Sequence, residues 1–172
     1  LCYEYINDHK AYSAPLFYRG FPKSCCASTN HVVCHGIPSD KILKEGDIVN
    51  VDVTAFKNGW HGDTSRMFEI GRAPIKAKKL IETTYESMMK GIEILKEDIQ
   101  LGDIGFVIQN YVEAQGFSVV QDFCGHGIGQ SFHKEPNILH YGEKGTGEKI
   151  KTGMIFTIEP MINLGSYETK IL

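Results

Sequence analysis

Apolar residues recur with helical spacing in the middle of the chain and gather into short strand-like runs on either side. A helix is predicted from Pro74 to Asp98, because proline is favoured in a first turn and apolar residues then recur every three or four positions. Those positions are Ala77, Leu80, Ile81, Tyr85, Met88, Met89, Ile92 and Leu95. A second helix with one apolar face is predicted from Asp103 to Gln115, and Gly116 ends it.

Three runs rich in β-branched or aromatic residues and bounded by glycines predict strands. They are residues 48–53, 66–70 and 154–158. Strands therefore come first, two helices follow, and a strand closes the chain. This order is typical of the α+β fold class.

Two of these strand segments match each other along the chain. Residues 44–52 align without a gap with residues 151–159, and both read Lys-x-Gly-x-Ile-apolar-x-Val/Ile-carboxylate. A His-Gly-Ile stands upstream of each segment, at His35 and at His126. The shared order predicts an internal duplication, with chance similarity between two glycine-bounded strands as the alternative.

The duplication predicts one catalytic domain made of two halves. The halves are residues 1–72 and 73–172. We expect both ends to be incomplete, because the first half lacks the long helix of the second. The second half in turn lacks a carboxylate after Glu159 that would correspond to Asp63.

Composition and charge exclude several classes of protein. The 172 residues are 42% hydrophobic and 23% charged, which excludes a disordered or collagen-like chain. A net charge of −3 argues against nucleic-acid binding, and no apolar stretch reaches the length of a membrane helix. Five cysteines without a C-x-x-C pattern, and no visible signal peptide, predict reduced thiols and a cytoplasmic location. We expect a monomer.

Three carboxylates lie where a strand makes a carboxylate costly. Asp52 and Asp63 are expected to face each other across a hairpin whose turn is residues 59–62. Glu159 interrupts the apolar run that precedes Pro160. Buried carboxylates repel one another unless they are protonated or paired, and a bound cation removes that cost.

Histidines add candidate ligands and proton carriers. His126 lies among three glycines that allow close backbone approach, and His35 and His133 are two further imidazoles. The remaining histidines, His9, His31, His61 and His140, are interpreted as surface or structural residues. Two Asp, one Glu and one His suit Mn²⁺, Fe²⁺, Co²⁺ or Zn²⁺, and bridging carboxylates permit two ions about 3.5–4 Å apart.

With these residues in place, the sequence resembles the type I (bacterial-type) methionine aminopeptidases. The matching motifs are Gly20–Ser24, Asn30–Pro38, Val51–Thr54, His61–Ser65, Gly125–Gly129, Phe132-His133-x-x-Pro136 and Thr157–Met161. They span nearly the whole chain in family order. The resemblance implies the pita-bread fold, itself a pseudo-two-fold duplication, and removal of the initiator Met from nascent chains.

The resemblance also assigns roles to residues. It implies two divalent ions (Co, Mn, Fe, Zn or Ni) held by Asp52, Asp63, His126 and Glu159, with Asp63 bridging. It implies that His35 and His133 contact the substrate and stabilise the tetrahedral intermediate, and that Glu159 accepts a proton from water. The implied walls of the Met side-chain pocket are Pro15, Tyr18, Phe21, Cys26 and Phe132.

The resemblance departs from the family at the ends of the chain and leaves two alternatives. A fifth family ligand, a bridging Glu beyond Glu159, and a Trp at the pocket rim are not found in the sequence. The alternatives are another pita-bread hydrolase, such as an X-Pro aminopeptidase, and a non-enzymatic pita-bread binding module. The expected partners are peptide or nascent-protein N-termini beginning with Met, and the ribosome is a further candidate.

Overall fold

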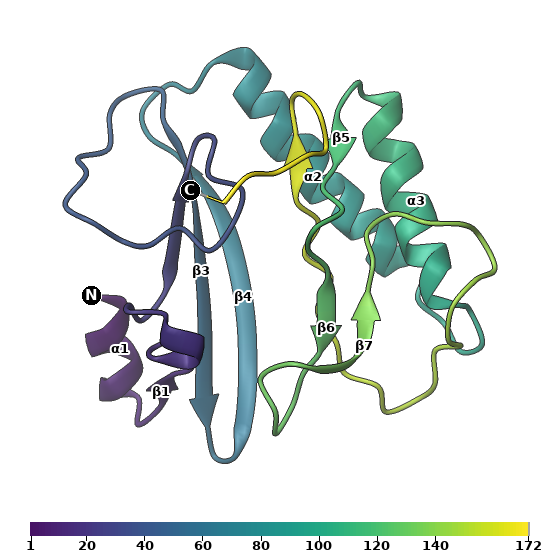
Figure 1. Ribbon diagram of the computed structural model, residues 1–172, viewed down its shortest axis with the longest axis horizontal. Helices are drawn as coiled ribbons and strands as arrows, with labels where there is room; N and C mark the ends of the chain where they lie inside the picture. Colours follow the sequence, from purple (N-terminus) through teal and green to yellow (C-terminus); the bar gives the residue numbers. More distant parts are fainter. Residues whose placement is uncertain (172) are drawn as a thin grey trace. The chain divides into compact units, whose positions relative to one another are not determined.

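A computed structural model describes residues 1–171, and the chain divides into two compact units (Figure 1). The first unit contains residues 1–77 and 128–132. The second contains residues 78–127 and the chain from His133 onward. In the described part of the chain, no helix combines the length and the apolar character that a membrane crossing requires.

The first unit is a four-stranded antiparallel sheet whose central strand is β3. Its elements are α1 (Cys2–Asp8), β1 (Tyr12–Ser13), the 3-10 turn η1 (Tyr18–Gly20), β2 (Cys26–Thr29), β3 (Ile48–Lys57) and β4 (Trp60–Glu69). Both β1 and β2 pair with one edge of β3, and β4 pairs with the other along its whole length. Figure 1 shows β3 and β4 as a long hairpin.

The predicted strands of the first unit are confirmed, but the turn prediction is wrong. Pairing continues to Lys57 and Trp60, so the turn is Asn58-Gly59 rather than residues 59–62. Both turn residues have positive φ, +52° and +86°, which an Asn-Gly pair accommodates at low cost. The hairpin is longer than predicted because its outer half alternates polar and apolar residues too weakly to show in the sequence.

The second unit packs two helices over short strand pairs. Its elements are α2 (Ile75–Glu93, which starts in the first unit), α3 (Leu101–Ala114), β5 (Ser118–Val119), β6 (Gly125–Gly127), β7 (Lys134–Ile138) and β8 (Ile162–Asn163). Strand β5 pairs with β8, and β6 pairs with β7. The buried core consists of Leu101, Ile104, Ile108, Val112, Val119, Ile138, Ile150 and Ile162.

Helix α2 buries a different face from the one its apolar residues predict. Its buried residues are the small Thr83, Ser87 and Gly91, four positions apart, whereas Tyr85 is 61% exposed. A Cβ on Gly91 would lie 3.0 Å from Ile108 Cδ1 of α3, so the small residues allow the two helices to approach closely. The helix also ends at Glu93, before the predicted Asp98.

The third predicted strand, residues 154–158, is wrong in extent. Only Phe156 forms a β-bridge, to Gly127, and the neighbouring Thr157 N–H donates to His126 O at 2.9 Å. The regular pairing of β6 is instead with β7, with a register shift between His126 and Gly127. Strand β7 was not predicted, because its residues are mostly polar and include a proline.

The pairing around the two matched carboxylates confirms the internal duplication. Asp52 lies opposite Cys26, and β1 pairs with the residues three and four positions after Asp52. Likewise, β5 pairs with the residues three and four positions after Glu159. The bridge between Gly127 and Phe156, continued in the same antiparallel register, places Cys124 opposite Glu159.

The two His-Gly-Ile segments, in contrast, are not equivalent. Gly36 lies beside β2, where its carbonyl accepts a hydrogen bond from Ala27 N–H at 2.8 Å. Gly127 lies within β6, the strand that corresponds to β2. The similarity of these tripeptides therefore reflects a shared need for close backbone approach, and a Cβ at either glycine would lie within 2.4 Å of a carbonyl oxygen.

We expect Gly105→Ala to destabilise the protein although alanine favours a helix. A Cβ at this position in α3 would lie 2.3 Å from Tyr141 O and 2.9 Å from Leu139 O. Overpacking of this kind costs about 1–3 kcal/mol of unfolding free energy, measurable by urea denaturation. The control is Gly165→Ala, where a Cβ meets nothing within 4 Å. Equal stability of the two variants would contradict the packing described for α3.

Candidate metal centre

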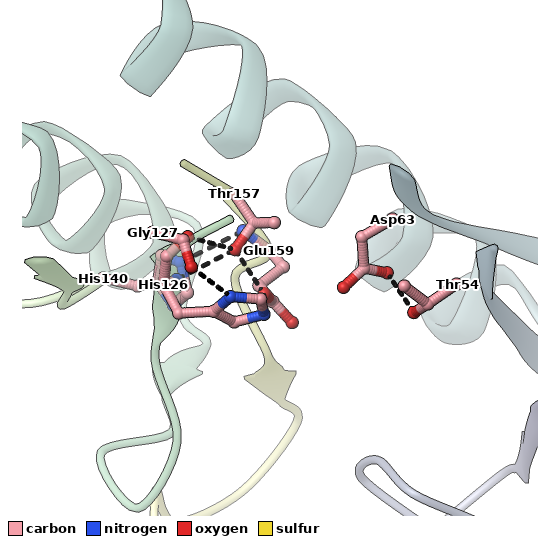
Figure 2. Close-up of polar contacts among 7 residues, drawn as sticks. All are labelled: Thr54, Asp63, His126, Gly127, His140, Thr157 and Glu159. Atoms are coloured by element: carbon pink, nitrogen blue, oxygen red, sulfur yellow. Dashed lines mark hydrogen bonds and ion pairs between the residues drawn. The ribbon is translucent and has the colours of Figure 1, made fainter. Parts of the chain in front are cut away.

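The second unit brings together His126 and Glu159, two of the predicted metal ligands. His126 lies in β6 and is 7% exposed, and its Nε2 is 3.6 Å from Glu159 Oε1 (Figure 2). Its Nδ1 is 3.1 Å from Gly127 O. A carbonyl oxygen only accepts, so Nδ1 carries the proton and, in the neutral ring, the Nε2 lone pair faces the carboxylate.

This arrangement fits a divalent metal ion. A lone pair and an ionised carboxylate repel each other at this distance, and either a proton or a cation removes the repulsion. A metal-ligating histidine normally donates its other ring N–H to a carbonyl or carboxylate, as His126 does to Gly127. The oxygen and imidazole donors are those that Mn²⁺, Fe²⁺, Co²⁺ or Zn²⁺ accept.

Two further residues hold Glu159, and the sequence did not point to either role. Thr157 Oγ1 donates to Glu159 Oε1 at 2.6 Å and accepts from His126 N–H at 2.9 Å. The main-chain N–H of Glu159 donates to His140 Nε2 at 3.1 Å. The available signals were the position of Thr157 two residues before Glu159 on extended backbone and the apolar neighbours of His140.

His140 was interpreted as a surface or structural residue, and it is completely buried. Burial lowers its pKa to about 4, so the ring is neutral at pH 7 and Nε2 can accept a hydrogen bond. Its Nδ1 has no hydrogen-bond partner among residues 1–171. The ring is therefore held by packing and by its contact with Glu159.

The first unit places Asp52 and Asp63 on one face of the β3–β4 hairpin. Asp52 lies opposite Ser65, and Asp63 lies opposite Thr54, so the two carboxylates are diagonal neighbours rather than a facing pair. The buried Thr54 donates its hydroxyl hydrogen to Asp63 Oδ1 at 2.9 Å. A threonine thus orients a candidate carboxylate ligand in each unit.

Cys26 faces the same carboxylates from β2. Burial raises its pKa to about 12, and Asp52 and Asp63 add to the effect. The thiol is therefore neutral at pH 7 and behaves as a small apolar group, as its predicted place in a pocket wall requires.

The two predicted substrate-contacting histidines lie in different units. In the first unit His35 has a left-handed backbone, φ +54°, which is unusual for a residue with a side chain. Partial desolvation lowers the pKa of His35, and the charge of Asp63 opposes this shift. In the second unit the exposed His133 ring lies 4.2 Å from the His126 ring, centroid to centroid.

The predicted pocket walls all belong to the first unit. Tyr18 and Phe132 have ring centroids 4.9 Å apart, and Phe132 is stacked on His61 at 5.5 Å with an interplanar angle of 8°. His61 also holds this segment through its Nδ1, 3.0 Å from Gly129 O. From the sequence, His61 was interpreted as a surface or structural residue, and its contacts with Gly129 and Phe132 were not predicted.

Each unit contains one pair of the predicted metal ligands. Among residues 1–171, no group of three or more His, Cys, Asp or Glu side chains is placed to hold a metal ion. The second unit contains the pair His126 and Glu159, and the first contains Asp52 and Asp63.

We expect acid to destabilise the protein partly through His140. The unfolded residue titrates near pH 6.5 and the folded one near pH 4, so only the unfolded chain binds this proton between those values. The unfolding free energy should therefore fall by up to about 3 kcal/mol as the pH drops through this window. Urea denaturation of the wild-type protein and of His140→Gln, both in a chelator, measures the difference. Parallel pH profiles would contradict burial as the cause.

Relatives of known sequence or structure match this chain over about two thirds of their own length. A methionine aminopeptidase of Rickettsia prowazekii is 59% identical over 98% of this chain and 65% of that protein. One of Escherichia coli is 52% identical over 100% of this chain and 66% of that protein. The chain thus spans less than two thirds of the length of these relatives.

The fold is shared more widely than the sequence. The crystal structure of the Rickettsia prowazekii methionine aminopeptidase superimposes with a TM-score of 0.97 at 58% identity, covering 98% of this chain and 68% of that one. A prolidase of Pyrococcus furiosus, 23% identical, is similar in fold alone, with a TM-score of 0.70 over 81% of this chain and 44% of that one. The predicted α+β pita-bread fold is thereby confirmed. The sequence profile of metallopeptidase family M24 matches residues 2–170, and the chain belongs to this family.

Proposed function

We propose that the whole protein is a methionine aminopeptidase that removes N-terminal Met from peptides and nascent proteins. The observation that carries this proposal is that His126 Nε2 lies 3.6 Å from the Glu159 carboxylate, so the two form a donor pair suited to a metal. The high identity to methionine aminopeptidases over nearly the whole chain supports this substrate rather than an X-Pro peptide.

Membership of a metallopeptidase family implies the use of a divalent metal. We propose that two ions are held by Asp52, Asp63, His126 and Glu159, and that Asp63 bridges them. Such ions, when bound, lower the pKa of a water molecule and polarise the carbonyl of the scissile bond. The fit rests on the donor types and on the geometry of the His126–Glu159 pair.

The acid–base work then belongs to side chains of this chain. We propose that Glu159 accepts the proton of the attacking water, a role for which Thr157 orients its half-buried carboxylate and His140 holds its main chain. We propose that His35 and His133 donate hydrogen bonds to the substrate carbonyl as negative charge develops on its oxygen.

The substrate side chain would lie against apolar and neutral groups. The proposed walls are Pro15, Tyr18, Phe21, Cys26 and Phe132, and the neutral thiol of Cys26 adds no charge to them. A flexible thioether such as Met suits an apolar pocket of this composition.

The setting of the reaction is proposed on the same basis. Residues 1–72 and 73–172 would form the two halves of one catalytic domain. Nascent N-termini beginning with Met would be the substrates in the cytoplasm, with the ribosome as a candidate partner. We propose a monomer that binds neither membrane nor nucleic acid.

The substrate proposal is tested by comparing two tripeptides with the full-length protein and added Mn²⁺ or Co²⁺. We expect release of Met from Met-Ala-Ser and negligible release of Ala from Ala-Pro-Ala, because the proposed apolar pocket suits the Met side chain and the methyl group of Ala would fill little of it. Preferred cleavage of Ala-Pro-Ala would instead indicate an X-Pro aminopeptidase. Metal binding without cleavage of either peptide would contradict both activities.

Replacement of the proposed bridging ligand should separate activity from stability. In Asp63→Asn the amide oxygen is neutral and binds cations weakly, so the rate of Met release should fall strongly. The melting temperature should change little. Metal content by mass spectrometry and turnover are measured on the same sample. Near-normal turnover with near-normal metal content would contradict the bridging role.

Replacement of His35 should leave the metal in place. In His35→Ala we expect unchanged metal content, because this residue is proposed to contact substrate. The loss of one well-placed donor should lower kcat by about 10²–10³-fold. A variant that purifies without metal would instead make His35 a ligand.

A further inference from the structure

Thr157 contacts both candidate ligands of the second unit at once. Its hydroxyl oxygen lies 2.9 Å from the His126 main-chain nitrogen and 2.6 Å from Glu159 Oε1 (Figure 2). Thr157 thus links the main chain of His126 to the carboxylate of Glu159.

The direction of these hydrogen bonds follows from the available protons. An ionised carboxylate only accepts, so the single hydroxyl hydrogen of Thr157 is donated to Glu159. The hydroxyl lone pairs then accept the His126 N–H. The other acceptor within reach, His126 O, is 3.5 Å away and competes poorly with a contact of 2.6 Å.

The main chain around Thr157 is fixed independently of its hydroxyl. Its N–H donates to His126 O at 2.9 Å, and a Cβ at Gly125 would lie 2.4 Å from Thr157 O. A threonine side chain has few χ1 rotamers, so a fixed main chain also fixes the hydroxyl. On its other side, the Glu159 main chain is held by His140 Nε2.

We propose that Thr157 is a positioning residue that holds the Glu159 carboxylate in the orientation in which, together with His126, it binds metal. The hydroxyl occupies one lone pair of Oε1 and restricts rotation of the carboxylate about its last bond. This deepens the proposed function and rests on it, since the role matters only if Glu159 ligates a metal. Partners of this kind are worth about 10–100-fold in metal affinity or activity.

The test compares Thr157→Val, which keeps the branched shape and loses the hydroxyl, with Thr157→Ser, which keeps the hydroxyl. Calorimetric titration of the metal-free full-length protein with Mn²⁺ should show affinity about 10–100-fold weaker for the valine variant. The serine variant should remain close to wild type. Thr152→Val, which removes an exposed hydroxyl elsewhere, is the matched control and should also match wild type.

Activity on Met-Ala-Ser separates this inference from the proposed function. If the wild type cleaves the peptide and Thr157→Val binds Mn²⁺ as the wild type does, the positioning role is overturned. If the wild type binds Mn²⁺ without cleaving and only Thr157→Val loses affinity, the positioning role stands and the proposed activity fails. Thermal melting checks folding, and Thr157→Ala carries the same comparison if the valine variant does not melt cooperatively.

Discussion

The close approach of the His126 imidazole to the Glu159 carboxylate is the constraint that explains the other contacts around this pair in the second unit. The hydrogen bond from Nδ1 to Gly127 O leaves Nε2 facing Oε1 at 3.6 Å, an arrangement that repels unless a positive charge lies between the two atoms. The surrounding residues hold the two side chains in this arrangement. Gly125 gives the main chain room, and Thr157 and His140 fix the glutamate from two sides. Holding an imidazole lone pair beside a carboxylate lowers the stability of the fold, and a cation bound by both groups would offset that loss.

The duplication explains why the first unit also places a candidate carboxylate ligand beside a cysteine. Asp52 and Glu159 stand at equivalent positions of equivalent strand pairings, and a cysteine, Cys26 or Cys124, accompanies each. Burial, with the nearby carboxylate as a second cause, raises the pKa of both thiols. Neutral thiols compete poorly with carboxylates for a divalent cation, because the thiolate is the metal-binding form. The candidate ligands in each unit are therefore the oxygen and imidazole donors, Asp52 and Asp63 in the first and His126 and Glu159 in the second.

Much of this could be predicted from the sequence, because the signals were local. The β-branched run of β3, the helical period of α3 and the match ending at Asp52 and Glu159 all survive in the structure. What could not be predicted depends on neighbours distant in sequence. The small-residue face of α2 makes sense only against Ile108, and the polar strand β7 is recognisable only beside β6. The roles of Thr157 and His140 follow from hydrogen bonds to Glu159 that no residue pattern encodes.

The central claim is that the His126–Glu159 pair binds a metal ion. It is tested most directly by anomalous diffraction from crystals of the full-length protein grown with Mn²⁺. The account predicts an anomalous peak within coordination distance of both His126 Nε2 and a Glu159 carboxylate oxygen. A fully folded protein that shows no peak at this pair, or in which the Nε2 of His126 donates directly to Glu159 with Mn²⁺ bound elsewhere, would contradict it.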